Sequence, residues 1–429
     1  MKYEKMVIFS TLNQMVNYIA IKEYGIKEII NLTMENNGQP NLKKFNYNKW
    51  DKNLEDILDE RVVPKRFGRQ AVINFNQLKD KLDRIDLGKK AVMWNITGGQ
   101  RNFVMAIMRY VFRERKDKGD SIVYFEGNEE KFYTYDIDFM EKEVDRVEEP
   151  YPMNIPLAFK LMGIEVKNKK DKNDTSEYYK KFIEKRQTDR EYRYYKRFYE
   201  KYMNNSILLE RLIETNKDIV GKEKINDKIE WLIDRMREID NCKELVECKE
   251  DRKTLRESLK IYGKRSKVFG YILEKIAFYK IIDVVINQKE LMDNVADLDI
   301  SVKINASYKD ERVSDHHIDE FDIVLLTKMG KIIIFECKSG AMTGDNAKST
   351  HYSTYRVAGV YGTPVLINPI TKHSEIKKYK NIEMAENAAK KAGLIICRMG
   401  NEATNITNIY PIEAYIKEVL KTGGNSYVQ

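Results

Sequence analysis

The sequence predicts an α/β protein in which two alternating stretches of strands and helices flank a strongly charged helical region. Apolar runs alternate with helical patterns over the first 150 residues, and a second alternating stretch begins near residue 266. Between about residues 167 and 260 the chain is highly charged and contains no proline, which favours long helices. We therefore expect three regions, at residues 1–150, 151–265 and 266–429, in a chain of 429 residues.

The first region alternates buried strands with amphipathic helices. Strands are expected at residues 5–9, 26–32 and 91–94, and helices at residues 14–24, 74–85 and 100–113. A hairpin is expected from residues 121–125 and 131–135, around the turn Glu126-Gly127-Asn128. Alternation of this kind is typical of a Rossmann-like sheet.

Three prolines, Pro150, Pro152 and Pro156, mark the start of the middle region. Its tyrosines are interleaved with lysine and arginine, at Tyr178, Tyr179, Tyr192, Tyr194, Tyr195, Tyr199 and Tyr202. Such mixing can bind nucleic acid through stacking and phosphate contacts. It is more often found in a helical hairpin or dimer interface with solvated outer faces, which is the favoured interpretation here, although the sequence leaves both open.

The last region begins with a helix at residues 266–286, which carries Glu274 among apolar side chains. The elements expected after it are a strand at 299–306, a hairpin made from 321–326 and 332–338, a helix at 346–360, a strand at 364–367, a helix at 383–392 and a strand at 394–397. The region is thus expected to form a second α/β unit.

The hairpin of this region carries charged residues beside apolar runs. Glu336 and Lys338 are two positions apart in a strand and therefore share a face, whereas Cys337 points away. A two-residue turn would place Asp322 opposite Cys337, but the three-residue turn Lys328-Met329-Gly330 places it opposite Glu336. Such turns usually end in a residue with positive φ, which glycine adopts easily. We therefore expect Asp322, Glu336 and Lys338 on one face.

Two carboxylates and an ammonium group are suited to cleavage of a phosphodiester. The carboxylates of Asp322 and Glu336 can hold a hard cation such as Mg²⁺ or Mn²⁺. The cation polarises the scissile phosphate, and Lys338 can orient the attacking water. The competing interpretation is an exposed strand end with a salt bridge.

A second polar constellation is expected at the carboxyl edge of the first sheet. The strand that ends at Trp94 is followed by Asn95-Ile96-Thr97-Gly98-Gly99-Gln100-Arg101, which leads directly into a helix. Two glycines at such a turn allow close approach of a ligand, and the helix N-terminus favours a phosphate. Ser10, Thr11 and Gln14 follow the first strand and lie at the same edge. No GxGxxG pattern is present, so a dinucleotide cofactor is not expected.

The run Asn95-x-Thr97-Gly98-Gly99 resembles the signature of CARF domains, the Rossmann-fold sensors associated with CRISPR systems. Their typical motif continues with Thr-Lys, whereas this chain has Gln100-Arg101 and keeps one cation. Asn17 matches a polar position often seen on the first helix of the family. The resemblance implies a homodimer that binds a cyclic oligoadenylate, most often the tetra-adenylate, across its interface.

The last region resembles the restriction-endonuclease-like fold, and Asp322 with Glu336-x-Lys338 is similar to its PD-(D/E)XK motif. Phe321 stands where that motif usually has proline, and Glu274 matches an acid that the family often adds on the first helix. A CARF domain followed by such a domain looks like the ancillary nucleases of type III CRISPR systems, over about residues 1–150 and 265–400.

The resemblance also implies roles for individual residues. Asp322, Glu336 and the backbone carbonyl of Cys337 would hold the metal, and Lys338 would activate or position the water. Glu320 lies two positions before Asp322 on the same face and would bind a second metal or tune the first. Activator binding would shift the protein toward an active nuclease that cleaves DNA, RNA or both.

Composition narrows the remaining possibilities. The net charge of +9 agrees with a polyanionic partner, and the four cysteines form no CxxC pair, so neither a zinc site nor a disulfide framework is expected. No apolar run approaches the length of about 20 residues that spans a membrane, and the N-terminus lacks a signal peptide pattern. We therefore expect a cytoplasmic protein without a membrane segment.

Three alternatives remain. Arg312 and His317 have the R-x4-H spacing of HEPN ribonucleases, but they fall in an expected loop rather than on a helix, and His316 and His317 fit better along a substrate groove or at an exposed position. A ligand-controlled regulator without catalysis would need a basic recognition helix, which the sequence does not offer. The third alternative is a nuclease controlled by a different nucleotide.

Overall fold

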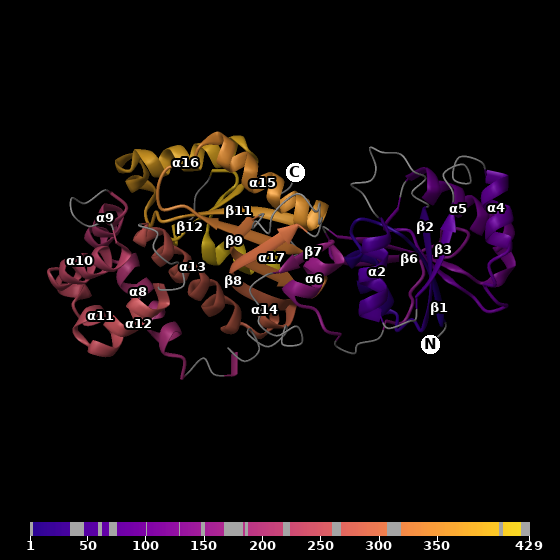
Figure 1. Ribbon diagram of the computed structural model, residues 1–429, viewed down its shortest axis with the longest axis horizontal. Coiled ribbons are helices and arrows are strands. Elements are labelled where there is room, and N and C mark those ends of the chain that lie inside the picture. The colour runs from indigo at the N-terminus through magenta and orange to yellow at the C-terminus, as the bar shows by residue number, and fades with distance from the viewer. Residues whose placement is uncertain are drawn as a thin grey trace.

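The structure is a computed structural model that describes residues 3–34, 47–58, 62–67, 75–99, 101–127, 129–146, 151–166, 183–184, 188–217, 224–259, 267–306, 319–402 and 406–421. Two sheets form two units that lie side by side, and a group of helices packs on the far end of the C-terminal unit (Figure 1). The expected α/β class with a Rossmann-like sheet is confirmed.

The described part of the N-terminal sheet has the strand order β3-β2-β1-β4-β5-β6. Its strands are β1 (Lys5–Phe9), β2 (Glu28–Met34), β3 (Val62–Phe67), β4 (Met93–Asn95), β5 (Ser121–Glu126) and β6 (Lys131–Tyr135). β1 to β5 pair in parallel and β6 pairs antiparallel with β5, which confirms the expected hairpin. The helices of this unit are α1 (Met15–Glu23), α2 (Tyr47–Leu58), α4 (Phe75–Asp83) and α5 (Arg101–Glu114). The chain order reverses between β1 and β4, where ligands bind in such sheets.

Two elements of this unit were not expected, α2 and β3. β3 pairs only with β2 and contains Pro64, Lys65 and Arg66, so it forms a polar edge of the sheet. Pro and charged residues are tolerated on edge strands. They also remove the apolar run by which a buried strand is recognised in a sequence.

The described part of the second sheet has the order β13-β12-β11-β10-β9-β8-β7. Its strands are β7 (Ile164–Val166), β8 (Val295–Ala306), β9 (Asp319–Thr327), β10 (Ile332–Cys337), β11 (Gly362–Asn368), β12 (Ile395–Arg398) and β13 (Ile409–Pro411). β7 to β10 pair antiparallel, and β10 to β13 pair in parallel. The helices around it are α6 (Ile155–Leu161), α13 (Val268–Ile286), α14 (Lys289–Asn294), α15 (Gly344–Ala358), α16 (Lys380–Lys391) and α17 (Ile412–Lys421).

The region expected to be a linker contributes directly to this sheet. β7 pairs with β8, and the short helix α6 packs beside it. A three-residue strand such as Ile164-Glu165-Val166 is too short to produce a periodic pattern, so it could not be predicted from the sequence. Residues 147–150 and 260–266, where we placed the boundaries, lie outside the described residues.

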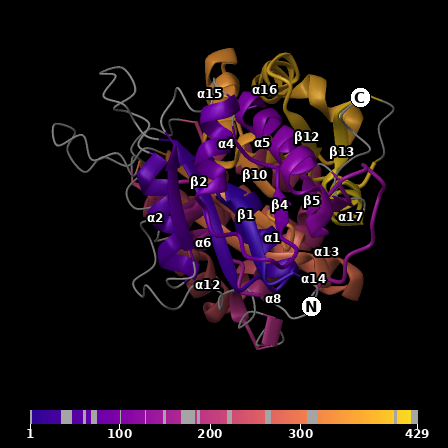
Figure 2. The same cartoon turned by 90° about the vertical axis from the view of Figure 1, so that its right-hand side faces the viewer.

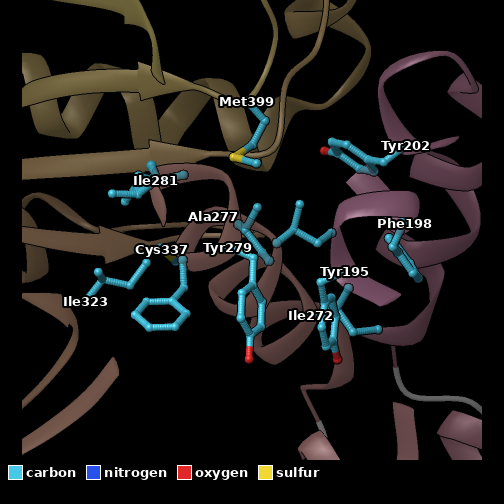
Figure 3. Close-up of a cluster of buried hydrophobic side chains, with 14 of the residues drawn as sticks. Tyr195, Phe198, Tyr202, Ile272, Ala277, Tyr279, Ile281, Ile323, Cys337 and Met399 are labelled. Carbon is cyan, nitrogen blue, oxygen red and sulfur yellow. The ribbon is translucent and has the colours of Figure 1, made fainter. Parts of the chain in front are cut away.

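The charged middle region forms α8 (Arg190–Met203), α9 (Ser206–Thr215), α10 (Ile225–Arg237), α11 (Glu244–Glu247) and α12 (Lys249–Leu259). Tyr194, Tyr195 and Tyr202 of α8 are fully buried in one apolar cluster with α13 (Figure 3). The helical packing interpretation is therefore confirmed for α8, and base stacking by its buried tyrosines is wrong. Tyr178 and Tyr179 lie outside the described residues.

The two units share a second apolar cluster. It combines Met15 and Ile19 of α1 with Val324 and Ile334 of the β9–β10 hairpin. The turn of that hairpin approaches α1 so closely that a Cβ atom on Gly330 would lie 2.4 Å from Met15 Sδ. Nearby, the hydroxyl group of Thr327 donates to the carboxylate of Glu130, which follows β5. The hairpin therefore contacts the N-terminal unit as well as its own sheet. The end view turns the N-terminal unit, with β1, β2 and α5, toward the viewer (Figure 2).

Candidate functional sites

The turn of the β9–β10 hairpin has the three-residue form that the sequence predicted. Ile332 pairs with Leu326 and Phe335 with Ile323, so Asp322 falls opposite Glu336 when the register is continued by one pair. Gly330 has φ +85°, and the N–H of Thr327 donates to the carbonyl of Lys331 across the turn (3.0 Å). The predicted register of the hairpin is confirmed.

This register brings the three predicted side chains together. Glu336 and Lys338 form an ion pair, and the backbone N–H of Cys337 donates to Oδ2 of Asp322 (2.7 Å). The Cys337 side chain packs instead in the apolar cluster that also contains Ile323 and Ala277 (Figure 3). The acids and the lysine thus occupy one face and the cysteine sulfur the other.

The charges of this cluster do not cancel. Burial, together with the nearby carboxylates of Glu336 and Glu274, raises the pKa of Asp322 well above its ordinary value, although Lys338 opposes this. Burial disfavours the ammonium group of Lys338, but Glu336 and Asp322 outweigh it and raise the pKa of Lys338. Asp322 thus lies within reach of two further acids and one ammonium group, and a cation bound beside it would favour its ionised form.

The other two acids predicted for this site differ in position. Glu274 is buried in α13, 8 % exposed, and its charge reaches both Asp322 and Cys337. Glu320 lies beside Lys303 of β8 at 4.0 Å, and the two are register partners. The charges that shift the pKa of Asp322 are those of Glu336, Glu274 and Lys338, so the structure brings Glu274 to the cluster more closely than Glu320.

The donor set of the cluster suits a hard cation. Asp322 and Glu336 offer carboxylate oxygens, and burial raises the pKa of the Cys337 thiol so strongly that only its backbone carbonyl is a suitable ligand. Across the described ranges, no group of three or more His, Cys, Asp and Glu side chains is arranged to hold a metal. A cation here would therefore be held by two side chains, backbone oxygen and water, which is common for Mg²⁺.

The predicted turns at the edge of the N-terminal sheet contact each other directly. A Cβ atom on Gly98 would lie 3.0 Å from Thr11 Cγ2, and one on Gly99 would lie 3.0 Å from Phe9 Cβ. Gly99 also has φ +97°, a conformation that other residues adopt only with strain. Both glycines are therefore needed for the loops after β1 and β4 to meet at the point where the chain order reverses.

The polar residues at this edge fall into two groups. Gln14, Asn17 and Asn95 are fully buried and bonded to one another: Asn95 Nδ2 donates to Asn17 Oδ1 (2.9 Å), and Asn17 Nδ2 donates to Gln14 Oε1 (2.8 Å). Ser10, Thr11 and Thr97 are half-buried, and Gly99 and Arg101 are exposed. Gln100 lies outside the described residues. The buried amide residues therefore support the loops of this edge from the interior, and the half-buried and exposed residues form its surface.

The sequence did not reveal the centre of this network, Asp51 of α2. Its Oδ1 accepts hydrogen bonds from Ser10 Oγ (2.7 Å), Gln14 Nε2 (2.9 Å) and Asn31 Nδ2 (2.9 Å). Asp51 belongs to a helix that was not expected, and a single acid in a polar segment carries no signal of burial. It holds two of the predicted residues in place.

Comparison with known proteins gives structural neighbours only. No family model and no curated protein matches the sequence. Protein VC1899 from Vibrio cholerae is 12 % identical, with a TM-score of 0.56 over 91 % of this chain and 96 % of that chain. Can2 from Sulfobacillus thermosulfidooxidans, solved in complex with cyclic tetra-adenylate, is also 12 % identical, with a TM-score of 0.50 over 91 % and 97 %. The chain shares its fold with these proteins.

A third solved structure, of a type III CRISPR defence DNA nuclease activated by cyclic oligoadenylate, is 13 % identical. The match spans 100 % of this chain and 53 % of the chain of that nuclease. Its TM-score of 0.46 is too low to support an argument about the fold. Within the described ranges, no helix is long and apolar enough to cross a membrane.

Proposed function

We propose that the protein is a metal-dependent nuclease of type III CRISPR defence that is switched on by a cyclic oligoadenylate. The observation that carries this proposal is the cluster of Asp322, Glu336 and Lys338 at the end of a buried hairpin. Its spacing resembles the PD-(D/E)XK motif, and an acid whose pKa is raised by burial and by like charges is typical of functional sites.

The residues of the cluster have distinct roles in this proposal. Asp322, Glu336 and the Cys337 carbonyl would hold Mg²⁺ or Mn²⁺, which supplies charge for the phosphate and its leaving oxygen. Lys338 remains protonated, because its pKa is raised, and its ammonium group orients the attacking water or contacts the scissile phosphate. Glu274 adds negative charge from below, and Glu320 would tune the site from the strand edge.

The N-terminal edge is the proposed activator site. The exposed Arg101 at the start of α5 would pair with a phosphate of the ring, and the Gly98-Gly99 turn allows the backbone to approach it. The cyclic tetra-adenylate is the proposed activator because Can2, which shares the fold, was solved with that ligand. A ring of this symmetry would lie on the two-fold axis of a homodimer and contact the same residues of both subunits.

The nuclease proposal is tested by digesting supercoiled DNA and single-stranded RNA with Mg²⁺ or Mn²⁺, with and without cyclic tetra-adenylate. Glu336→Gln and Lys338→Met should each lower the cleavage rate by at least about 100-fold. Glu383→Gln on α16 and the change Lys328→Met at an exposed side chain of the hairpin turn are matched controls that should cleave normally. Cleavage that survives Glu336→Gln would falsify the site.

The activator proposal has its own experiment. Arg101→Gln should raise the concentration of cyclic tetra-adenylate needed for half-maximal cleavage by about tenfold, because a charge-assisted phosphate contact is lost. Cleavage at saturating activator should be unchanged. Arg113→Gln, an exposed position at the other end of α5, is the matched control. Tight binding of the activator without any cleavage would instead indicate a regulator without catalysis.

A further inference from the structure

The tyrosines of α15 are unusual among those the structure describes. Tyr352 and Tyr355 are 67 % and 57 % exposed, whereas the tyrosines of α8 are mostly buried. The two lie one helical turn apart, at about 4.5 Å along the helix axis. That rise is on the order of one step between stacked nucleotides. An exposed aromatic ring has no packing role of its own in the chain.

Two cations share the face of these tyrosines. Lys348 precedes Tyr352 by one turn, and Arg356 follows Tyr352 by one turn, so the four side chains form a stripe along α15. Within the described ranges neither cation has an ion pair, and both are exposed. The cations of α8 differ, because Arg190, Lys196 and Arg197 pair with Glu250, Asp283 and Asp251. The stripe on α15 therefore has positive charge left for a phosphate.

The stripe lies on the helix that follows the candidate catalytic cluster in the chain. α15 begins at Gly344, soon after Lys338, and packs against β11 and β10, the strand that carries Glu336. It lies on the outer side of the C-terminal sheet (Figure 1). His351, the residue before Tyr352, contacts the carbonyl of Ala392 through Nδ1 (2.9 Å), so the end of α16 lies beside α15.

We propose that this stripe binds an unpaired nucleic-acid strand and leads it to the cluster of Asp322, Glu336 and Lys338. Tyr352 and Tyr355 would stack on successive bases, and Lys348 and Arg356 would contact the phosphates between them. Stacking needs a free base face, which a duplex does not offer along its side. A second copy of this chain fits less well, because two stripes meeting about a two-fold axis would bring the like charges of Lys348 and Arg356 together. The inference rests on the proposed nuclease function.

The test measures binding separately from cleavage. Full-length protein carrying Glu336→Gln is mixed, in chelator, with a fluorescein-labelled oligothymidylate, an oligouridylate or a duplex, with and without cyclic tetra-adenylate. Fluorescence anisotropy should show tighter binding of the single strands than of the duplex. The change Tyr352→Ala with Tyr355→Ala should weaken single-strand binding at least about tenfold, whereas the two Tyr→Phe changes keep the rings and should preserve it.

Salt dependence tests the cations. Lys348→Gln with Arg356→Gln should reduce the slope of log affinity against log salt by about 1.4, because each lost phosphate contact removes about 0.7 for a single strand. Lys196→Gln with Arg197→Gln removes the same charge from α8, where both cations are already paired, and should leave the slope unchanged.

Three outcomes overturn the proposal: the Tyr→Ala protein binds single strands as tightly as its parent, the duplex binds as well as the single strands, or the stripe variants change only the oligomeric state seen by light scattering. Failure of the nuclease proposal would give a different result from failure of the stripe proposal. The wild-type protein would then not cleave, but single strands would still bind, and this binding would still depend on Tyr352 and Tyr355.

Discussion

At Asp322 the chain places a carboxyl group where burial and two further acids oppose its ionisation. The folded protein therefore holds this proton more tightly than the unfolded chain does. The stability that the group contributes falls as the pH rises through its raised pKa. Below the ordinary pKa of an aspartate both states are protonated, so the penalty disappears there. A functional acid of this kind lowers stability at neutral pH.

Asp322→Asn should therefore stabilise the protein at neutral pH in chelator while it abolishes cleavage. We expect the thermal midpoint to rise by roughly 1 °C for about 1 kcal/mol of added stability, the scale for a chain of 429 residues. The gain should shrink as the pH falls toward 4, the region of the ordinary aspartate pKa. Thermal unfolding measured over a pH series checks this, and a lower midpoint for the variant at neutral pH would contradict it.

Metal addition gives a second measurement at the same residue. Mg²⁺ or Mn²⁺ should raise the thermal midpoint of the wild-type protein, because a ligand that binds the folded state stabilises it. The same addition should have little effect on Asp322→Asn, which lacks one of the two carboxylates. Asp345→Asn at the exposed start of α15 is the matched control and should respond like the wild type. Equal shifts in all three proteins would show that the metal binds elsewhere.

The residues of the two sites were predictable to different degrees. Asp322, Glu336 and Lys338 could be placed together because strand alternation and one glycine determine the register. At the N-terminal edge the sequence indicated which polar residues gather, but not that Gln14, Asn17 and Asn95 are buried. A buried polar residue cannot be distinguished from an exposed one in the sequence, because its burial depends on hydrogen-bond partners such as Asp51, which are far away along the chain.

At the scale of elements, the turn of the β9–β10 hairpin has two requirements that can be separated. Gly330 needs a positive φ, and it also needs the absence of a Cβ atom beside Met15 and Ile19 of α1. Gly393, after α16, shares the first requirement at φ +74° but has open space around its Cβ position.

Gly393→Ala should therefore cost only backbone strain, about 1 kcal/mol of unfolding free energy. Gly330→Ala should cost that amount and roughly 1–3 kcal/mol more, because the methyl group overlaps α1. Urea unfolding of both variants measures the difference directly. Equal losses in the two variants would mean that the hairpin turn moves away from α1 at little cost.

Element prediction succeeded where apolar periodicity is strong and failed where it is weak. The central strands and α1, α5 and α13 were expected because apolar residues recur through them over a long stretch. β7 and β13 are three residues each, and β3 is a polar edge strand, so none has such a run. On α8, the recurrence of Tyr192, Tyr195, Tyr199 and Tyr202 at helical spacing was the available sign of a buried face.

At the scale of the whole molecule, α1 connects the two sites. Gln14 and Asn17 of α1 belong to the polar network of the N-terminal edge, and Met15 and Ile19 contact the hairpin that carries Asp322 and Glu336. The hydrogen bond between Thr327 and Glu130 adds a second contact between the units. A shift of α1 on ligand binding would therefore move the hairpin, because packed cores deform little.

Thr327→Val should weaken the coupling between activator binding and cleavage, while it leaves the residues of both sites unchanged. We expect the ratio of cleavage rates with and without cyclic tetra-adenylate to fall by roughly 2- to 30-fold, the usual range for one contact in a coupled system. Activator titrations and cleavage assays on the same preparation measure it. Thr254→Val on α12, which loses an intrahelical hydrogen bond to Glu250, is the matched control. An unchanged ratio in Thr327→Val would exclude this contact as part of the coupling.

The shared apolar cluster also limits how such a protein can be divided or rebuilt. Either unit expressed alone would expose the side chains that now cover the other, among them Met15, Ile19, Val324 and Ile334. Fusing the N-terminal unit to a different catalytic partner would meet the same difficulty unless the turn at residues 327–331 came with it. The two halves must therefore change together in evolution, and a protein engineer would have to exchange α1 and the hairpin as a single matched part.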